Sequence, residues 1–143
     1  MSKHPLTLVI VDGHVRARTA LTERLQRLAD VVVLGAVGEL AQAVEMIGRV
    51  GPHAVLVDPR TLGISPLAAL AALVGSGPPI VVYTASLAGS EEEGFAQAGA
   101  SATLLKGSDV PGLLHQLRAV IVAHGHTTHI HGVPDEQMPP STV

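Results

Sequence analysis

The stretch His53–Gly63, HAVLVDPRTLG, decides the fold. Residues 54–57 form a continuous apolar run rich in β-branched side chains, and a proline stands shortly before and shortly after it, which predicts a short strand. A run without polar alternation is typical of a strand that is covered on both faces, as in a parallel sheet. Asp58 follows at the carboxyl end of this strand. Ligands of open α/β sheets bind beyond the carboxyl ends of the strands, so Asp58 is the first candidate functional residue.

Apolar runs of this kind alternate along the chain with segments of helical period. The predicted strands span residues 6–11, 31–37, 54–57, 79–84 and 101–105, and the predicted helices span 15–29, 39–50, 66–74, 91–98 and 110–121. Ser65, Ser90 and Asp109 stand where helix N-caps are expected. Strand and helix alternate through the chain, and this order predicts one doubly wound α/β domain, with a parallel sheet and helices on both faces.

Composition excludes several classes of protein. The chain has 143 residues, a formal net charge of −3, no cysteine, and only Tyr83 and Phe95 as aromatic residues. This length favours one domain, and the charge and scarce aromatics argue against direct nucleic-acid binding. No apolar run is long enough for a membrane span or a signal peptide. We therefore expect a cytoplasmic protein without a membrane partner.

Three more polar residues stand at the ends of predicted strands. Asp12 and Lys106 come directly after the first and fifth strands, and Thr84 is the last residue of the fourth, so the parallel topology predicts that they meet Asp58 at one edge of the sheet. Two carboxylates, a hydroxyl and an ammonium group can perform phosphoryl transfer: Asp58 would attack as a nucleophile, and a divalent cation held by the carboxylates would offset the phosphoryl charge. Lys106 and Thr84 would hold the phosphoryl oxygens.

These pieces resemble the receiver domain of two-component response regulators, over about residues 5–123. The matching segments are LVIVDGH (8–14), VLVDPRTLG (55–63), IVVYTAS (80–86) and AGASATLLK (98–106). The resemblance implies a flavodoxin-like, CheY-like fold, whose five-stranded parallel sheet has the strand order 2-1-3-4-5.

The resemblance also implies roles for the candidate residues. Asp58 would be the phosphoacceptor, and a sensor histidine kinase would be the donor. Asp12, Asp58 and the backbone carbonyl of Arg60 would bind Mg²⁺. Thr84 and Lys106 would bind the phosphate and act as the switch. The chain would then be a phosphorelay protein and not an enzyme.

The chain departs from the family pattern at three positions. Gly13 stands where a second acid usually follows Asp12, which predicts a weakened or lost Mg²⁺ site because this ion relies on a few hard oxygen ligands. Thr103 stands where the switch usually has an aromatic residue. Pro59 removes a backbone N–H next to Asp58. These departures keep a second hypothesis open, namely a pseudo-receiver that serves as an interaction or scaffold domain without phosphorylation.

Other interpretations of single residues stay open. Arg60 is either a solvated loop residue or a partner of Asp58 that stands in for the charge of the metal. His14 lies at the mouth of the predicted pocket, beside Gly13, and is either a structural or solvent-facing residue or a residue that contacts the site. A flavin- or nucleotide-binding enzyme of the same fold is disfavoured, because no glycine-rich phosphate loop follows the first strand and two acids would repel an anion.

Output would depend on a protein partner or on an output domain that this chain lacks. Phosphorylation would alter the face formed by the fourth helix, the fifth strand and the fifth helix, and the same face could join two copies as a homodimer. Residues 124–143, HGHTTHIHGVPDEQMPPSTV, change in composition. We expect a poorly ordered tail or linker there, in preference to a transition-metal site made by its histidines.

Overall fold

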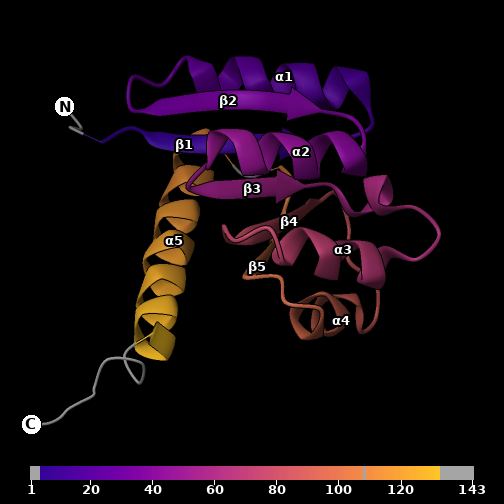
Figure 1. Cartoon of the computed structure of the whole chain (residues 1–143). Coiled ribbons are helices and arrows are strands. Elements are labelled where there is room, and N and C mark those ends of the chain that lie inside the picture. The colour runs from indigo at the N-terminus through magenta and orange to yellow at the C-terminus, as the bar shows by residue number, and fades with distance from the viewer. Residues whose placement is uncertain (1–3, 108, 133–143) are drawn as a thin grey trace, which may run out of the picture.

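The structure, a computed structural model, describes residues 4–107 and 109–132 and contains a parallel five-stranded sheet in the order β2-β1-β3-β4-β5 (Figure 1). This order confirms the predicted doubly wound, CheY-like fold. The elements are β1 (Leu6–Val11), α1 (Val15–Gln26), β2 (Val31–Val37), α2 (Leu40–Val50), β3 (Ala54–Val57), the short 3-10 helix η1 (Pro59–Leu62), α3 (Pro66–Val74), β4 (Ile80–Thr84), α4 (Glu91–Gln97), β5 (Ala102–Leu105) and α5 (Val110–Gly132).

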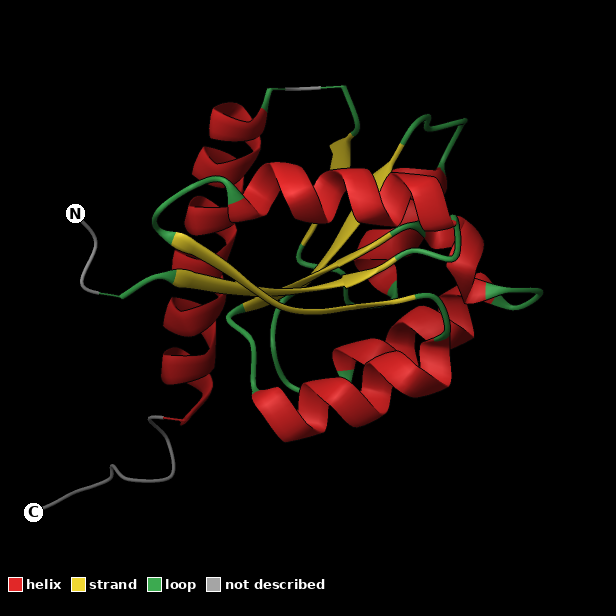
Figure 2. Cartoon of the chain, turned by 90° about the horizontal axis from the view of Figure 1, so that it is seen from above, coloured by secondary structure: helices red, strands yellow, loops and turns green. Residues whose placement is uncertain are grey.

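Helices cover both faces of the sheet, as Figure 2 shows from above. One hydrophobic cluster joins the sheet to α1 and α5 through Leu21, Leu25, Leu113 and Leu117. A second cluster lies on the other face and joins the sheet to α2, α3 and α4, with Phe95 as its only aromatic residue. Both clusters are made of aliphatic side chains almost throughout, which explains how a chain with so few aromatic residues still forms a closed core.

The central strand β3 explains the continuous apolar run of the sequence. All of its residues, 54–57, are fully buried, because successive side chains point alternately into the two clusters. Backbone pairing continues just past the strand ends: the N–H of Asp58 donates to Val11 O at 2.9 Å, and the N–H of Lys106 donates to Thr84 O at 2.7 Å. The sheet itself therefore fixes the residues of the candidate site at one edge.

The structure differs from the prediction in several details of its elements. α1 ends at Gln26, three residues early, and an unpredicted 3-10 turn, η1, follows β3. Ser65 and Ser90 precede α3 and α4 as expected, but neither makes a side-chain capping hydrogen bond. The predicted cap at Asp109 is present, since its Oδ1 accepts from Gly112 N at 2.9 Å.

The largest difference is the length of α5, which continues to Gly132, past residue 123 where the sequence predicted the domain to end. Histidine and threonine each cost only a few tenths of a kcal/mol in a helix, and adding residues to an existing helix is favourable, so composition alone does not end α5. The remainder of the predicted tail, residues 133–143, lies outside the described residues. Among the helices that the structure describes, none has the length and apolarity that crossing a membrane requires.

We predict that Gly99→Ala destabilises the domain by about 1–3 kcal/mol, because Gly99 has a φ of +109° and an added Cβ would lie 2.9 Å from Val74 Cγ1. Gly48→Ala is the matched control. Gly48 lies on the exposed side of α2 with open space around its Cα, so this change should stabilise the domain slightly. Urea unfolding followed by circular dichroism measures both, and equal effects would contradict the prediction.

Candidate functional site

The candidate site lies where β1, β3 and β5 end, and it contains two buried carboxylates. Asp12 is 5% exposed and Asp58 is 3% exposed, and both follow directly on strands that lie side by side in the sheet. A buried carboxylate is costly unless it is paired and hydrogen-bonded. The two acids therefore require positive partners, and the structure supplies them from residues 60 and 106.

Arg60 holds Asp58 through both carboxylate oxygens. The Asp58 Oδ1 accepts from the backbone N of Arg60 at 2.9 Å and from its Nε at 3.2 Å, while Oδ2 accepts from Arg60 Nη2 at 3.0 Å. The local backbone favours this pairing, because Asp58 is the N-cap of η1 and Pro59 is the first residue of that turn. The side chain of Arg60 is nevertheless 71% exposed, so the guanidinium covers the carboxylate from the solvent side.

Lys106 joins the two acids. Its Nζ donates to Asp58 Oδ2 at 2.8 Å and lies 3.3 Å from Asp12 Oδ2, and its side chain is 21% exposed. The ammonium group also stands over the ring of Tyr83, 5.7 Å from the ring centroid, within the range of a cation–π contact. Asp12, Asp58 and Lys106, which lie far apart in the sequence, are thus directly connected.

The positive groups outweigh burial in setting the protonation of the site. Burial alone would raise the pKa of Asp58, but hydrogen bonds from Arg60 and Lys106 and the charge of Lys106 lower it from 3.8 to about 2. For Lys106, burial acts to lower the pKa, and the hydrogen bond to Asp58 and the charges of both acids raise it overall. Asp58 and Lys106 are therefore both charged at neutral pH. The formal charges of Asp12, Asp58, Arg60 and Lys106 sum to zero.

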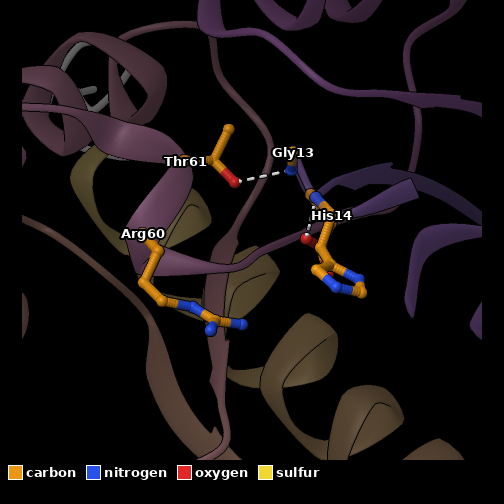
Figure 3. Close-up of a pocket in the computed structure, with 5 residues that line it drawn as sticks. Gly13, His14, Arg60 and Thr61 are labelled. Carbon is orange, nitrogen blue, oxygen red and sulfur yellow. Dashed lines mark hydrogen bonds between the residues drawn. The ribbon is translucent and has the colours of Figure 1, made fainter. Parts of the chain in front are cut away.

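A shallow pocket of about 270 Å³ opens beside Asp12, and Figure 3 shows Arg60 and Thr61 on one side and Gly13 and His14 on the other. The N–H of Gly13 donates to Thr61 Oγ1 at 2.9 Å, which ties the loop after β1 to the loop after β3. His14 caps α1, since its Nδ1 accepts from Ala17 N at 3.2 Å, and its own N–H donates to an oxygen of Asp12 at 2.9 Å.

Thr84 lies at the same edge, but its hydroxyl points to its own loop. The Oγ1 of Thr84 donates to the carbonyl of Ser86 at 2.9 Å, and the side chain lines a second pocket of about 320 Å³ together with Arg60. Thr103 pairs with Val82 across β4 and β5 and is partly buried. The structure thus connects Asp12, Asp58 and Lys106 directly, whereas the Thr84 side chain bonds its own loop and lines a pocket together with Arg60.

Sequence reasoning left the role of Arg60 open and missed Thr61 and Tyr83. The structure shows the second of the two interpretations of Arg60, a pairing with Asp58, although its side chain is also largely exposed as a solvated loop residue would be. No sequence signal distinguishes a loop threonine that bridges two loops, as Thr61 does. For Tyr83, the available sequence signal is the alternation of side chains along its strand, combined with the position of Lys106 at the end of the neighbouring strand.

The donor set does not fit the implied Mg²⁺ ion in this arrangement. All four oxygens of Asp12 and Asp58 already accept hydrogen bonds from the chain, and the Arg60 guanidinium contacts both oxygens of Asp58. Gly13 carries no carboxylate. Among the side chains that the structure describes, in residues 4–107 and 109–125, no three His, Asp or Glu residues gather as a metal-binding group. The implied role of the Arg60 carbonyl as a ligand stays a prediction.

The chain is similar to known proteins over most of its length. It is 32% identical over 117 residues to the nitrate/nitrite response regulator protein NarP of Escherichia coli, covering 80% of this chain and 54% of that protein. The BeF3-activated N-terminal receiver domain of Klebsiella pneumoniae RstA matches with a TM-score of 0.70 and 26% identity, over 80% of this chain and 97% of that one. The Borrelia burgdorferi CheX–CheY–BeF3–Mg²⁺ complex matches with a TM-score of 0.70 and 16% identity, over 82% and 90% of the two chains.

No protein-family model matches the chain, and the chain spans about half the length of the curated relatives it matches. The strand order, the convergent acids and lysine, and these similarities together identify a receiver domain of the response-regulator type. The receiver is atypical, because Gly13 and Thr103 depart from the family pattern and Arg60 covers Asp58.

We predict that the acid stability of the domain depends on Asp58. A folded-state pKa of about 2 against 3.8 means that the stabilisation is fully present above about pH 4 and is lost as the pH falls toward 2, a loss of about 2 kcal/mol. Asp58→Asn should flatten this part of the pH profile, measured by urea unfolding at a series of pH values. Asp30→Asn, which removes a half-exposed partner of Arg118 before β2, should keep the wild-type slope. Equal slopes for all three proteins would refute the prediction.

Proposed function

We propose that this receiver domain accepts a phosphoryl group on Asp58 from a sensor histidine kinase and transmits the signal through a protein partner. The single observation that carries this proposal is the 2.8 Å contact between Asp58 Oδ2 and Lys106 Nζ at the carboxyl edge of the sheet, beside Asp12. In this role the domain is a substrate of the kinase and a phosphoprotein, and not itself an enzyme.

The protonation of the site supports this chemistry. A carboxylate whose pKa is about 2 is ionised at neutral pH, as a nucleophile must be. The Lys106 ammonium is positioned to hold a phosphoryl oxygen after transfer. The hydroxyl of Thr84 would have to leave the Ser86 carbonyl before it could bind the same group, which is a rotation of one side chain. Because Gly13 has no carboxylate and Arg60 covers Asp58, we expect Mg²⁺ binding to be weakened or lost.

Output would use the face formed by α4, β5 and α5. β5 is an edge strand, and Leu105 on it is 50% exposed. The short helix α4 contains Gly94, and few large apolar side chains hold it, which favours local rearrangement. A downstream protein, an output domain outside this chain or a second copy of the chain are the candidate occupants of this face, in a cytoplasmic pathway without direct nucleic-acid binding.

A second candidate function is that of a pseudo-receiver, a scaffold domain that binds partners without being phosphorylated. Three observations favour it: Gly13 in place of an acid, Thr103 in place of an aromatic switch residue, and an Asp58 carboxylate held at both oxygens by Arg60. In this alternative the ion-pair cluster would serve only to stabilise the edge of the sheet.

Phosphorylation distinguishes the two candidates. We expect the purified protein, incubated with acetyl phosphate, to gain the mass of one phosphoryl group, because Asp58 is ionised and lies beside Lys106. Asp58→Ala should abolish the gain, as intact-mass spectrometry measures. Asp30→Ala, which removes a carboxylate before β2, should retain it.

The opposite outcomes have clear meanings. A mass gain that survives Asp58→Ala would place the modification elsewhere and remove Asp58 from the mechanism. No gain with acetyl phosphate or with phosphorylated kinase, in a protein whose circular dichroism shows it folded, would favour the pseudo-receiver.

A further inference from the structure

The Asp58 carboxylate is fully occupied in this structure. An ionised carboxylate offers about four lone-pair positions, two on each oxygen. Here Oδ1 accepts from Arg60 N and Nε, and Oδ2 accepts from Arg60 Nη2 and Lys106 Nζ. A nucleophilic oxygen needs a free lone pair that faces the atom it attacks. At least one of these contacts must therefore open before Asp58 can react, and the exposure of the two side chains indicates which one.

Arg60 is the removable partner. Its side chain is 71% exposed, whereas that of Lys106 is 21% exposed and is held by two carboxylates. Arg60 also lines the pocket that Gly13 borders and the pocket that Thr84 borders. Because the exposed Arg60 side chain covers Asp58 from the solvent side, its movement would uncover the carboxylate without disturbing the Lys106 contacts.

We infer that the Arg60 guanidinium occupies the cation position of this site, so that it excludes Mg²⁺ and itself supplies the positive charge for phosphoryl transfer to Asp58. This inference rests on the proposed function of Asp58. Asp12, Asp58 and Lys106 together carry one negative charge, and Arg60 makes the cluster neutral without any bound ion. A guanidinium fork matches a phosphoryl group as well as it matches a carboxylate, so Arg60 can pass from one to the other.

Every group in the proposed transfer step belongs either to the chain or to the phosphoryl donor. With acetyl phosphate as the donor, Arg60 leaves Asp58 and binds two oxygens of the incoming phosphoryl group. A lone pair of the freed Asp58 oxygen forms the new oxygen–phosphorus bond while the bond from phosphorus to the acetate oxygen breaks. Acetate leaves with that electron pair, and no proton moves. Lys106 stays beside Asp58 and balances the charge of the product together with Arg60.

Mg²⁺ titration tests the exclusion of the metal without any phosphorylation. Tyr83 is the only tyrosine, the chain has no tryptophan, and the Tyr83 ring lies under Lys106, so its fluorescence reports on the site. We expect no saturable Mg²⁺ response from the wild-type protein and a saturable response from Arg60→Gln. The affinity of the variant should exceed the upper limit set for the wild type by at least about tenfold, because the competing guanidinium no longer contacts the Asp58 oxygens. Arg49→Gln, which removes an exposed arginine paired with Glu45 on α2, should behave as the wild type.

A second measurement tests the positive role of Arg60. In the presence of a chelator, wild-type protein should gain phosphoryl mass from acetyl phosphate at the rate seen with Mg²⁺. Arg60→Gln should be slower by about a hundredfold in chelator, the usual cost of losing a positioned donor at a transferring group, and Mg²⁺ should recover part of the rate. Arg60→Lys keeps the positive charge but loses the two-pronged guanidinium. Its phosphorylation rate in chelator should lie between the rates of the wild type and of Arg60→Gln.

The outcomes separate this inference from the function on which it rests. Wild-type protein that binds Mg²⁺ as tightly as Arg60→Gln does, or that is phosphorylated only with Mg²⁺ present, overturns the role of Arg60 while Asp58 remains the phosphoacceptor. If no condition adds phosphoryl mass, the proposed function fails, and the Tyr83 titration still decides whether Arg60 excludes the metal. Circular dichroism spectra confirm that each variant is folded before either measurement.

Discussion

The site depends on the neutralisation of two buried carboxylates at one edge of the sheet. Backbone pairing of β1 and β3 places Asp12 and Asp58 beside each other with less than a tenth of either exposed. Two like charges in such surroundings raise each other's pKa and favour protonation, unless cations offset them. Lys106 bridges both acids and Arg60 covers the second, so the sheet can end in charged residues and remain stable. The surrounding loops are arranged by these contacts.

The loop after β1 and the loop after β3 are shaped by the same cluster. Asp58 begins η1 by accepting the N–H of Arg60, and this turn directs the arginine back over the carboxylate that precedes it. The turn also brings Thr61 to the N–H of Gly13, which joins the two loops. Gly13 brings no second negative charge to this edge, while Arg60 brings a positive charge against Asp58. The glycine and the arginine thus belong to one arrangement, in which a missing negative charge and an added positive charge have the same effect.

The sequence predicts the strands and the shared edge well, because hydrophobic runs and parallel topology determine both. The continuous run at 54–57 is buried on both faces as expected, and Asp12, Asp58 and Lys106 meet as strand-end residues should. Side-chain direction could not be predicted in the same way. Nothing in the sequence shows that the Thr84 hydroxyl donates to Ser86, since a strand-end threonine reaches its own loop as easily as a neighbouring strand. The length of α5 was missed because His and Thr only weakly oppose a helix that has already formed.

Displacing Lys106 from the site would cost more free energy than displacing Arg60. We therefore expect Arg60 to be the cation that moves when a ligand approaches. Lys106 is anchored by two carboxylates and by contact with Tyr83, so displacing it would leave two buried charges unpaired. Arg60 makes strong fork-like contacts, but water can replace each of them because the side chain lies at the surface. An anion that approaches this edge therefore meets two positive charges, of which Lys106 is held in place and Arg60 can move. The movable charge can follow the anion while Asp58 remains paired with Lys106, so a single side-chain rotation changes the site from a closed ion pair to an open nucleophile.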